Sequence, residues 1–480
     1  MSQPLPPRLA EVVAALSFAT DLGMGQPMGH ALRTCLLSMR IGRALNLKES
    51  ELGGLYYVSL LRRIGCTSDS HDLAGWFPDD IAAHARLFLI DFAKPSQVLR
   101  DVVKHAGGGA GTVRRARMLV GALTGGKSGV EVFFRSSCEV AQRLAERLQF
   151  SDNVLRPLDQ TFERWDGKGF PKNIKGEQLA LSTRIAQVTE DAEVYHRLGG
   201  PEAAVAIVRQ RSGHTHDPAL ADLFCKMGPE LFRQIDVLSP WEAVMAEEPG
   251  TPKLLSEAEF DRALEAMADF TDLKSPYFTG HSRGVASFAA LAAQCHGLPE
   301  ADVRLLRRAG LVHDLGKSGI PNSVWEKPGS LSDGEWEQVR LHSYYTERVL
   351  ARPPALAAIS SVASMHHERI DGSGYHRGVT RQAQPITSRI LAAADTYQTK
   401  IEHRPHRAAL APQDAAAELQ SLANQGRIDS EALAAVLTAV GHKAARKEWP
   451  ASLTSREVEV LRLIAQGYSQ KQVAADLYLS

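Results

Sequence analysis

An internal repeat constrains the fold of this chain more than any other feature of its sequence. The motif LVHDLGK (311–317) has a degraded counterpart, LLRRIGC, 251 residues earlier at 60–66. Further along, two pairs of segments match at a constant shift of 205 residues: ERWDGKGFP with ERIDGSGYH, and STRIAQVTE with TSRILAAAD. Collinear matches at constant shifts indicate a duplication. The chain therefore contains two related copies of one domain.

The spacing within the repeat shows which histidine belongs with each motif. His281 lies 32 residues before His313, and His30 lies 32 residues before Arg62. Because the shift falls from 251 to 205 residues, the first copy must carry 46 additional residues after its motif. We expect this insert at about 67–130.

The length and a linker-like segment suggest how the chain is divided. A chain of 480 residues has room for two to four domains. The charged stretch MAEEPGTPK (245–253) contains proline and glycine and is typical of a linker. The predicted organisation is a first copy at 1–244, a linker at 245–256, a second copy at 257–445 and a third unit at 450–480.

The apolar residues recur with helical spacing, as in EFDRALEAMADF (259–270) and ADVRLLRRAGLV (301–312). Few segments alternate as strands do, so the predicted fold class is all-α: two helical bundles and a partial C-terminal helix-turn-helix. The formal net charge is zero, which favours neither nucleic acid nor a membrane over the molecule as a whole. The five cysteines form no CxxC pair, and no apolar stretch is long enough for a membrane span. We expect a cytoplasmic protein.

Residues that bind metals are dense in the second copy. The candidate ligands are His281, His313, Asp314, His342, His366, His367 and Asp395. Imidazole and carboxylate suit iron, manganese or zinc. A single histidine in an alanine-rich helix is more often an ordinary core or surface residue, but adjacent HD and HH pairs make coincidence a poor explanation.

The HD pair has a specific chemical use. On one helix, His313 could bind one ion while the Asp314 carboxylate bridges two. Two ions a few ångströms apart can hold the attacking and leaving oxygens of a phosphate ester. Lys317 lies four residues after His313, so we expect it on the same helical face, where it could contact the phosphate.

The second copy resembles the HD-GYP subgroup of HD-domain metal phosphohydrolases. The motifs GHSRGV, HDLGKSGIPNSVWEKPGSLSDGEWEQVRLH and HHERIDGSGYH carry the resemblance, which extends over 260–440 and more weakly into the first copy. It implies an all-helical enzyme with two or three metal ions, most often iron or manganese, with zinc also possible. It also implies hydrolysis of cyclic di-GMP or a related cyclic dinucleotide.

The resemblance also implies residue roles. One ion would be bound by His281, His313, Asp314 and Asp395, and the other by Asp314, His342, His366 and His367. Asp314 and a hydroxide would bridge the ions, and Lys317 would contact the phosphate. Gly374, Tyr375 and Arg404 would bind or shape the substrate. The sequence departs from the family pattern twice: His376 replaces the proline of GYP, and Tyr277 replaces a glutamate that serves a third ion, so two ions are expected.

The first copy has lost most of the ligands. His30 and Glu190 remain, whereas arginines 62 and 63 replace His-Asp, Thr161 and Phe162 replace His-His, and Ser136 or Ser137 occupies the region of His342. Two arginines oppose metal binding by like-charge repulsion. They could hold an anion in a sensory site, or be solvated residues on a scaffold or dimer face; we favour the second interpretation. A homodimer is expected.

The C-terminal segment LTSREVEVLRLIAQGYSQKQVAADLYLS (453–480) begins two short helices with capping boxes. It resembles the LuxR-type DNA-binding domain. The given sequence ends at Ser480, where the recognition helix of that family should begin, so the motif is expected to be truncated. DNA binding is expected only if a recognition helix follows residue 480.

These observations predict a metal-dependent HD-GYP phosphodiesterase coupled to transcription regulation. The alternative is a non-catalytic transcriptional regulator that senses a nucleotide and uses the HD site only for binding.

Overall fold

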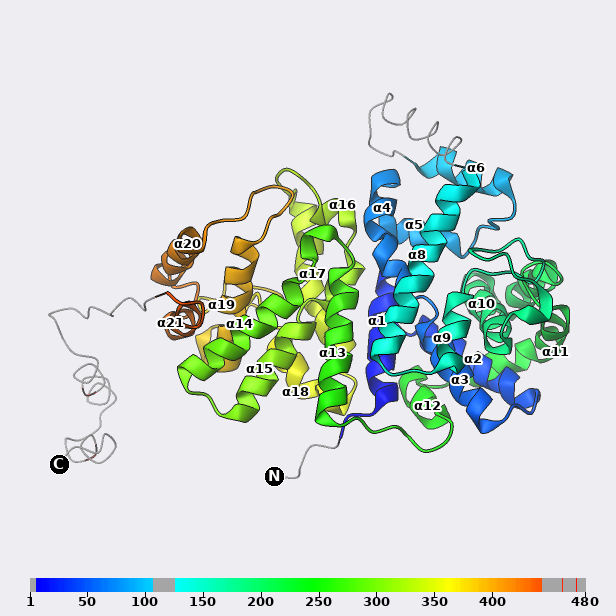
Figure 1. Ribbon diagram of the computed structural model, residues 1–480, viewed down its shortest axis with the longest axis horizontal. Helices are drawn as coiled ribbons and strands as arrows, with labels where there is room; N and C mark the ends of the chain where they lie inside the picture. Colours follow the sequence, from blue (N-terminus) through cyan, green and yellow to red (C-terminus); the bar gives the residue numbers. More distant parts are fainter. Residues whose placement is uncertain (1–5, 107–125, 443–459, 461–471, 473–480) are drawn as a thin grey trace.

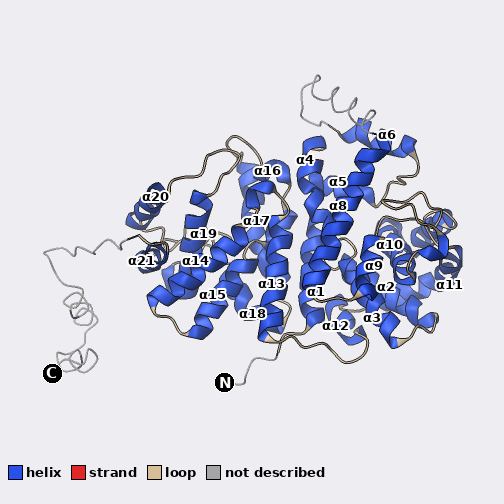
Figure 2. Cartoon of the chain, in the orientation of Figure 1, coloured by secondary structure: helices blue, strands red, loops and turns tan. Residues whose placement is uncertain are grey.

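The computed structural model describes residues 6–106 and 126–442, together with Val460 and Gln472. Every regular element in this part of the chain is a helix, and only isolated β-bridges occur beside the helices (Figure 2). The all-α prediction is therefore confirmed. Apart from Val460 and Gln472, the C-terminal segment with its two predicted helices lies outside the described residues.

The first copy contains a helical bundle and an extra layer. The bundle helices are α1 (Leu9–Gly23), α2 (His30–Ala44), α3 (Glu49–Leu61), α9 (Asp152–Asp159), α10 (Leu181–Arg211), α11 (Pro218–Ile235) and α12 (Pro240–Glu247). The short 3-10 helix η1 (Ile64–Asp69) follows α3, and the extra layer and its return helix are α4 (Ser70–Trp76), α5 (Asp80–Leu87), α6 (Pro95–His105) and α8 (Gly126–Arg147).

The second copy repeats the bundle with fewer additions. Its helices are α13 (Glu257–Asp272), α14 (His281–His296), α15 (Glu300–Val312), α16 (Asn322–Trp325), α17 (Asp333–Leu350), α18 (Pro354–Ala363), α19 (Ile386–Ile401), α20 (Pro412–Asn424) and α21 (Ser430–Ala439). Its short 3-10 helices are η3 (Pro276–Phe278), η4 (Leu315–Gly319) and η5 (Arg381–Ala383). The first copy has a matching 3-10 helix, η2 (Gly176–Gln178), before α10, as η5 stands before α19.

The two copies use the same local devices at matching positions. The helices α2 and α14 begin at His30 and His281, each after a glycine with positive φ that ends the preceding turn. Gly65 in η1 lies so close to α8 that a Cβ would overlap the carbonyl oxygen of Ser137, and Gly316 approaches His342 in the same way. Ser137, rather than Ser136, therefore corresponds to His342.

The copies pack against each other reciprocally along their first helices. The helix α1 contacts η4 and α17 of the second copy, whereas α13 contacts η1 and α8 of the first. Figure 1 shows α1 and α13 next to each other in the middle of the molecule. Buried apolar residues of both copies form one continuous core. Each HD or RR motif is thus supported by a helix of the other copy.

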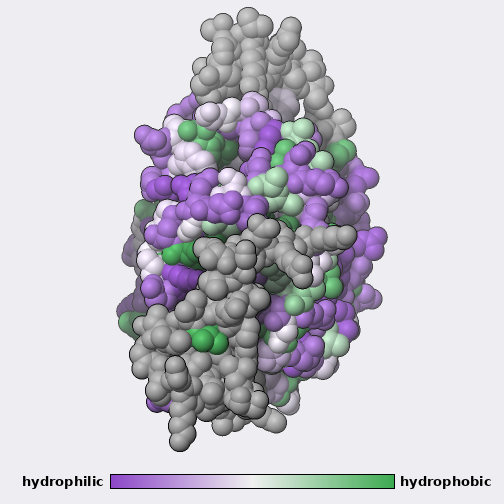
Figure 3. Space-filling view, turned by 90° about the vertical axis from the view of Figure 1, so that its left-hand side faces the viewer, coloured by the Kyte–Doolittle hydropathy of each residue, from purple (hydrophilic) through white to green (hydrophobic). Residues whose placement is uncertain are grey.

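The second copy forms one end of the molecule, and helices cover this end (Figure 1). The helices α20 and α21 lie at this end, and α21 packs on α14. Figure 3 shows mostly hydrophilic side chains on the described part of this face, with small separate hydrophobic patches. Among the described helices, none combines the length and the apolar character that crossing a membrane requires.

Candidate metal centre

All seven predicted ligands come together inside the second copy. His281 begins α14, His313 and Asp314 follow α15, His342 lies in α17, His366 and His367 follow α18, and Asp395 lies in α19. Six of these side chains are buried, and the side chain of His367 is 22% exposed. Three helices and two turns therefore converge on one polar centre.

The HD motif does not lie on one continuous helix, and this expectation was wrong. The helix α15 ends at Val312, and Asp314 has φ −106° and ψ 9°, outside the α-helical region. Lys317 belongs to the following 3-10 helix rather than to the helical face of His313. Adjacent side chains on an α-helix point about 100° apart. Ending the helix here lets both side chains of the motif point into the same centre.

The two carboxylate oxygens of Asp314 face different pairs of histidines. Oδ2 lies 3.3 Å from Nε2 of His281 and 3.1 Å from Nε2 of His313. Oδ1 lies 3.6 Å from Nε2 of His342 and 3.5 Å from Nε2 of His366. A carboxylate in this position is able to bridge two ions, one on each side.

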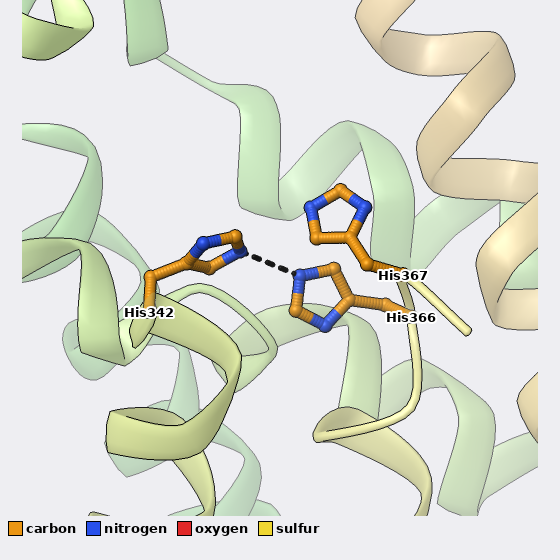
Figure 4. A group of neighbouring side chains, drawn as sticks. All are labelled: His342, His366 and His367. Carbon is orange, nitrogen blue, oxygen red and sulfur yellow. Dashed lines mark hydrogen bonds between the residues drawn. The ribbon is translucent and has the colours of Figure 1, made fainter. Parts of the chain in front are cut away.

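Asp395 also lies between His281 and His367, with one carboxylate oxygen toward each. Its Oδ1 is 3.4 Å from Nε2 of His281, and its Oδ2 is 3.8 Å from Nδ1 of His367. Figure 4 shows His342, His366 and His367 with their rings directed toward one another, and the Nε2 atoms of the first two are 3.0 Å apart.

Hydrogen bonds fix the orientation of three of these rings. Nδ1 of His313 donates to the carbonyl oxygen of Gly310 at 2.8 Å, and Nδ1 of His366 donates to that of Ala363 at 2.7 Å. His342 makes the same bond to the carbonyl three residues earlier. A carbonyl oxygen can only accept, so Nδ1 carries a proton in each ring and Nε2 faces the centre.

The polar atoms at the centre fit divalent metal ions. Nε2 of His281 and His313 and both oxygens of Asp314 are buried and make no regular hydrogen bond within the described part of the chain. Buried polar atoms are normally satisfied. The ligand atoms of one set, His281, His313 and Asp314, lie within 4.8 Å of one another, as do those of His342, His366 and His367. Imidazole and carboxylate are ligands of first-row metals.

The protonation states at the histidine-rich side suit metal binding. Burial lowers the pKa of His342 to about 3 and that of His367 well below its ordinary value. Burial opposes the charge of Asp314, but His313 and Lys317 outweigh it and hold the pKa of the carboxyl well below its usual range. Neutral imidazole and ionised carboxylate are the forms that bind metals.

Lys317 lies at the edge of the centre. Its Nζ is 2.5 Å from Oδ2 of Asp314 and 4.3 Å from the ring centroid of Phe278. The Trp325 ring centroid is 5.5 Å away, and this ring also contacts His342 edge to face. Sequence reasoning missed Phe278 and Trp325, because only the folded chain brings these aromatic rings to the lysine.

The predicted substrate residues lie in two places. Gly374 approaches the backbone so closely that a Cβ would overlap the amide nitrogen of Arg369. The ring of Tyr375 stands 4.7 Å from that of His367. His376, in place of the proline of GYP, contacts Glu347, with Nε2 2.8 Å from Oε2.

Arg404 lies away from that loop, beside α14. Its Nη1 donates to the carbonyl oxygen of Tyr277 at 2.6 Å, and its Nη2 donates to Oε2 of Glu402 at 2.6 Å. Its side chain is 8% exposed. The Tyr277 position, where a third-ion ligand would stand, thus contributes a backbone carbonyl to this arginine.

In the first copy, the arginines replace the cations of a metal centre. Nε of Arg62 donates to Oε2 of Glu190 at 2.9 Å, and Arg63 donates to both oxygens of this carboxylate, at 2.8 and 2.6 Å. The side chain of Arg62 is 6% exposed. The expectation of solvated arginines was wrong, because the carboxylate that remains at this position is buried and needs positive partners.

Each described arginine around Arg62 and Arg63 is paired with a carboxylate. Arg63 lies between aromatic rings, with its guanidinium carbon 4.8 Å from the centroid of Phe88. A cavity of about 90 Å³ borders the pair. Its other arginines are bound to carboxylates, Arg164 to Asp91 and Arg211 to Asp191.

Family comparisons agree with the repeat. A family model described as the HD domain matches residues 127–220 and 265–432, and one described as bacterial regulatory proteins, luxR family, matches residues 451–480. The chain belongs to the HD-domain family, and the resemblance of its C-terminal segment to LuxR-type domains is confirmed.

Several relatives are phosphodiesterases. The 3′3′-cGAMP-specific phosphodiesterase 3 of Vibrio cholerae is 31% identical over 435 residues, which cover 90% of this chain and 94% of that protein. A cyclic di-GMP phosphodiesterase of Thermotoga maritima is 32% identical over 164 residues, 34% of this chain and 44% of that protein. The crystal structure of the cyclic GMP-AMP-specific phosphodiesterase V-cGAP3 of V. cholerae superposes with a TM-score of 0.64 at 29% identity, covering 91% of this chain and 98% of that one.

Proposed function

We propose that this chain is a metal-dependent phosphodiesterase that opens cyclic dinucleotides at the centre in its second copy. The observation that carries the proposal is the position of Asp314, whose two oxygens face separate pairs of buried histidines. This geometry supports two divalent ions, one with His281, His313 and Asp395, the other with His342, His366 and His367. Iron or manganese suits this ligand set, and zinc remains compatible with it.

The substrate class follows from the relatives. The relative that covers nearly the whole of both chains is named for 3′3′-cGAMP, whereas a relative that covers about a third of this chain is named for cyclic di-GMP. We therefore propose 3′3′-cGAMP as the preferred substrate and cyclic di-GMP as a second one.

The residues around the centre have distinct tasks in such a reaction. Divalent ions, when bound, supply Lewis-acid charge and activate water for attack on phosphorus. Lys317 lies at the edge of the centre and can donate from Nζ to a non-bridging phosphate oxygen as negative charge develops. Tyr375, next to His367, and Gly374 would shape the loop that receives the substrate. Arg404 was predicted to bind substrate, but its contacts support a different role, described below.

The test is turnover by the full chain. Purified protein loaded with Mn²⁺ or Fe²⁺ should convert 3′3′-cGAMP to a linear dinucleotide, and it should do so faster than it converts cyclic di-GMP. Asp314→Asn should abolish turnover, whereas Asp222→Asn, an exposed residue on α11, should leave it unchanged. Absence of turnover with every cyclic dinucleotide and both metals would refute the enzymatic function.

The luxR-family match favours a second role in transcription. We propose that cyclic-dinucleotide turnover or binding in the second copy is coupled to a DNA-binding function of the C-terminal region. Tight binding of 3′3′-cGAMP without cleavage would instead support the purely sensory alternative. Chromatography of the ligand recovered from the metal-loaded protein separates the two, since an enzyme yields the linear dinucleotide and a sensor returns the cyclic form.

The assembly and the domain limits stay predictions. We propose a homodimer, because regulators with a helix-turn-helix commonly bind paired half-sites as symmetric dimers, and sedimentation of the full chain would test it. The irregular segment between α12 and α13 is consistent with a linker near residues 248–256. Limited proteolysis there would test the predicted boundary.

A further inference from the structure

One histidine of the centre is oriented differently from the others. Nδ1 of His313, His342 and His366 donates to the carbonyl three residues earlier in each case. His281 is the first residue of α14, after Gly280 in the left-handed conformation, so the chain before it does not offer such a carbonyl in helical register. Nδ1 of His281 instead donates to Oε2 of Glu402 at 2.9 Å.

Glu402 is itself held by two other side chains. Oε2 accepts from Nη2 of Arg404 at 2.6 Å, and Oε1 accepts from Nε2 of Gln398 at 2.6 Å. Gln398 fills the space beside Gly284 of α14, where a Cβ would overlap its amide group. The carboxylate is therefore fixed relative to both α14 and α19, and its side chain is 17% exposed.

A carboxylate behind a metal-binding histidine differs chemically from a carbonyl. It carries a full negative charge, which makes the imidazole a stronger donor through Nε2 and fixes both the tautomer and the ring plane. Four histidines of the centre make a hydrogen bond through Nδ1 in the described part of the chain, and among these four only His281 bonds to a carboxylate.

We propose that Glu402 is a positioning residue for the ion bound by His281, His313, Asp314 and Asp395, and that Arg404 and Gln398 serve it. Arg404 then supports the metal centre through Glu402 rather than binding substrate. The inference rests on the proposed function, because it requires that this ligand set hold an ion. It predicts that the two ions differ in their dependence on Glu402.

The experiment measures binding of Mn²⁺ to the full chain without substrate. Apo protein is titrated with Mn²⁺ and followed by equilibrium dialysis with metal analysis, and by the electron paramagnetic resonance signal of the coupled pair of ions. In Glu402→Gln, which keeps the shape of the side chain, one ion should bind about 10- to 100-fold more weakly, the effect usual for partners behind metal ligands, while the other is unchanged. The coupled signal should fade at metal concentrations that saturate the unaltered protein.

The control is Glu418→Gln, which removes an exposed carboxylate that pairs with Lys400 on the surface of α20. It should bind both ions normally. Equal weakening of both ions in Glu402→Gln, or unchanged binding of both, would overturn the inference. If Glu402→Gln weakens the binding of both ions and also lowers the melting temperature of the apo protein, Glu402 has a general structural role and the inference is overturned.

The outcome is separable from that of the proposed function. If the unaltered protein binds two Mn²⁺ ions and cleaves no cyclic dinucleotide, the proposed function fails while the selective effect of Glu402→Gln still supports the inference. If the unaltered protein cleaves 3′3′-cGAMP but Glu402→Gln retains both ions, the inference fails and the proposed function stands.

Discussion

One pair of residues shows most clearly how the two copies differ. At equivalent places after α3 and α15, one copy has Arg62 and Arg63 and the other has His313 and Asp314. In the first copy the guanidinium groups neutralise the buried Glu190 directly. In the second, the carboxylates remain beside imidazoles that can share an ion. A buried carboxylate needs positive partners in either case, and the two copies supply them in different ways.

Lys317 provides the first prediction. Lys317→Ala should lower kcat for 3′3′-cGAMP by about 10²-fold, the loss typical of removing one charge that stabilises the transition state. Lys327→Ala, which removes a lysine bound to Glu335 at the start of α17, should leave kcat unchanged. Steady-state kinetics with the Mn²⁺-loaded enzyme measures the effect. An unaltered kcat in Lys317→Ala would show that the lysine does not contact the reacting phosphate.

Glu190 provides a prediction about acid stability. Burial opposes its charge, but Arg63 and Arg62 outweigh it and lower its pKa to about 2. A carboxyl whose pKa is lower in the folded state stabilises the protein above its unfolded pKa of about 4.3, and this stability is lost as the pH falls from there toward 2. Glu190→Gln should therefore reduce the free energy of unfolding at pH 7, by about 3–5 kcal/mol, and less at pH 3.

Urea unfolding at pH 7, 4.5 and 3 measures this difference. Glu146→Gln, which alters an exposed pair with Arg143, should change the free energy of unfolding by no more than about 1 kcal/mol. A difference between Glu190→Gln and the unaltered protein that stays constant across the three pH values would contradict the assigned role of the arginine pair.

At the scale of elements, each motif is held against a neighbouring helix by a glycine. Gly316 in η4 lies against α17 at His342 and Thr346, and Gly65 in η1 lies against α8 at Ser137. The close approach places the motif and the next ligand side by side in the second copy. In the first copy Gly65 still lies against α8, although Ser137 is not a metal ligand like histidine. We infer that the glycine allows close helix packing in both copies.

Gly316→Ala tests this contact. The new Cβ would overlap the carbonyl oxygen of His342, so α17 must move, which costs about 1–3 kcal/mol of stability or more. Because His342 moves with α17, affinity for the ion on its side should fall as well. Gly329→Ala has open space around the added Cβ and should match the unaltered protein. Thermal unfolding and Mn²⁺ titration measure both effects, and equal behaviour of the two variants would argue against the contact.

At the scale of the whole molecule, the copies form an internal pseudo-dimer. Their first helices support each other's motifs. The insert of the first copy adds a buried ion pair across the interface, in which Nζ of Lys274 lies 3.1 Å from Oδ2 of Asp80 and both side chains are fully buried. Oδ1 of Asp80 also accepts from the amide nitrogen of Asn322, at the start of α16.

Asp80→Asn should weaken this interface strongly. Removing one partner of a buried ion pair leaves the other charge without compensation, which costs about 3–5 kcal/mol. Asp72→Asn, an exposed aspartate in the neighbouring α4, should cost less than about 0.5 kcal/mol. Calorimetric unfolding of the full chain measures the loss. A melting temperature equal to that of Asp72→Asn would show that Lys274 finds another partner.

Much of this organisation could be predicted from the sequence. The constant 32-residue spacing assigned His281 to the HD motif, and helical periodicity predicted the fold class. The end of α15 at Val312 could not be predicted in the same way, because Leu315 keeps the helical spacing of the apolar residues before it. In the structure the helix ends before the motif, and this lets the side chains of His313 and Asp314 converge on one centre.

By itself, the sequence determined the duplication, the all-helical class, the candidate ligands and their absence from most matching positions of the first copy, because these depend on residue type and spacing along the chain. Only the tertiary structure decided which oxygen of Asp314 faces which histidines, that Glu190 neutralises Arg62 and Arg63, and that Glu402 stands behind His281. These contacts join residues far apart in the chain, and packing of the helices around a buried polar centre selects them.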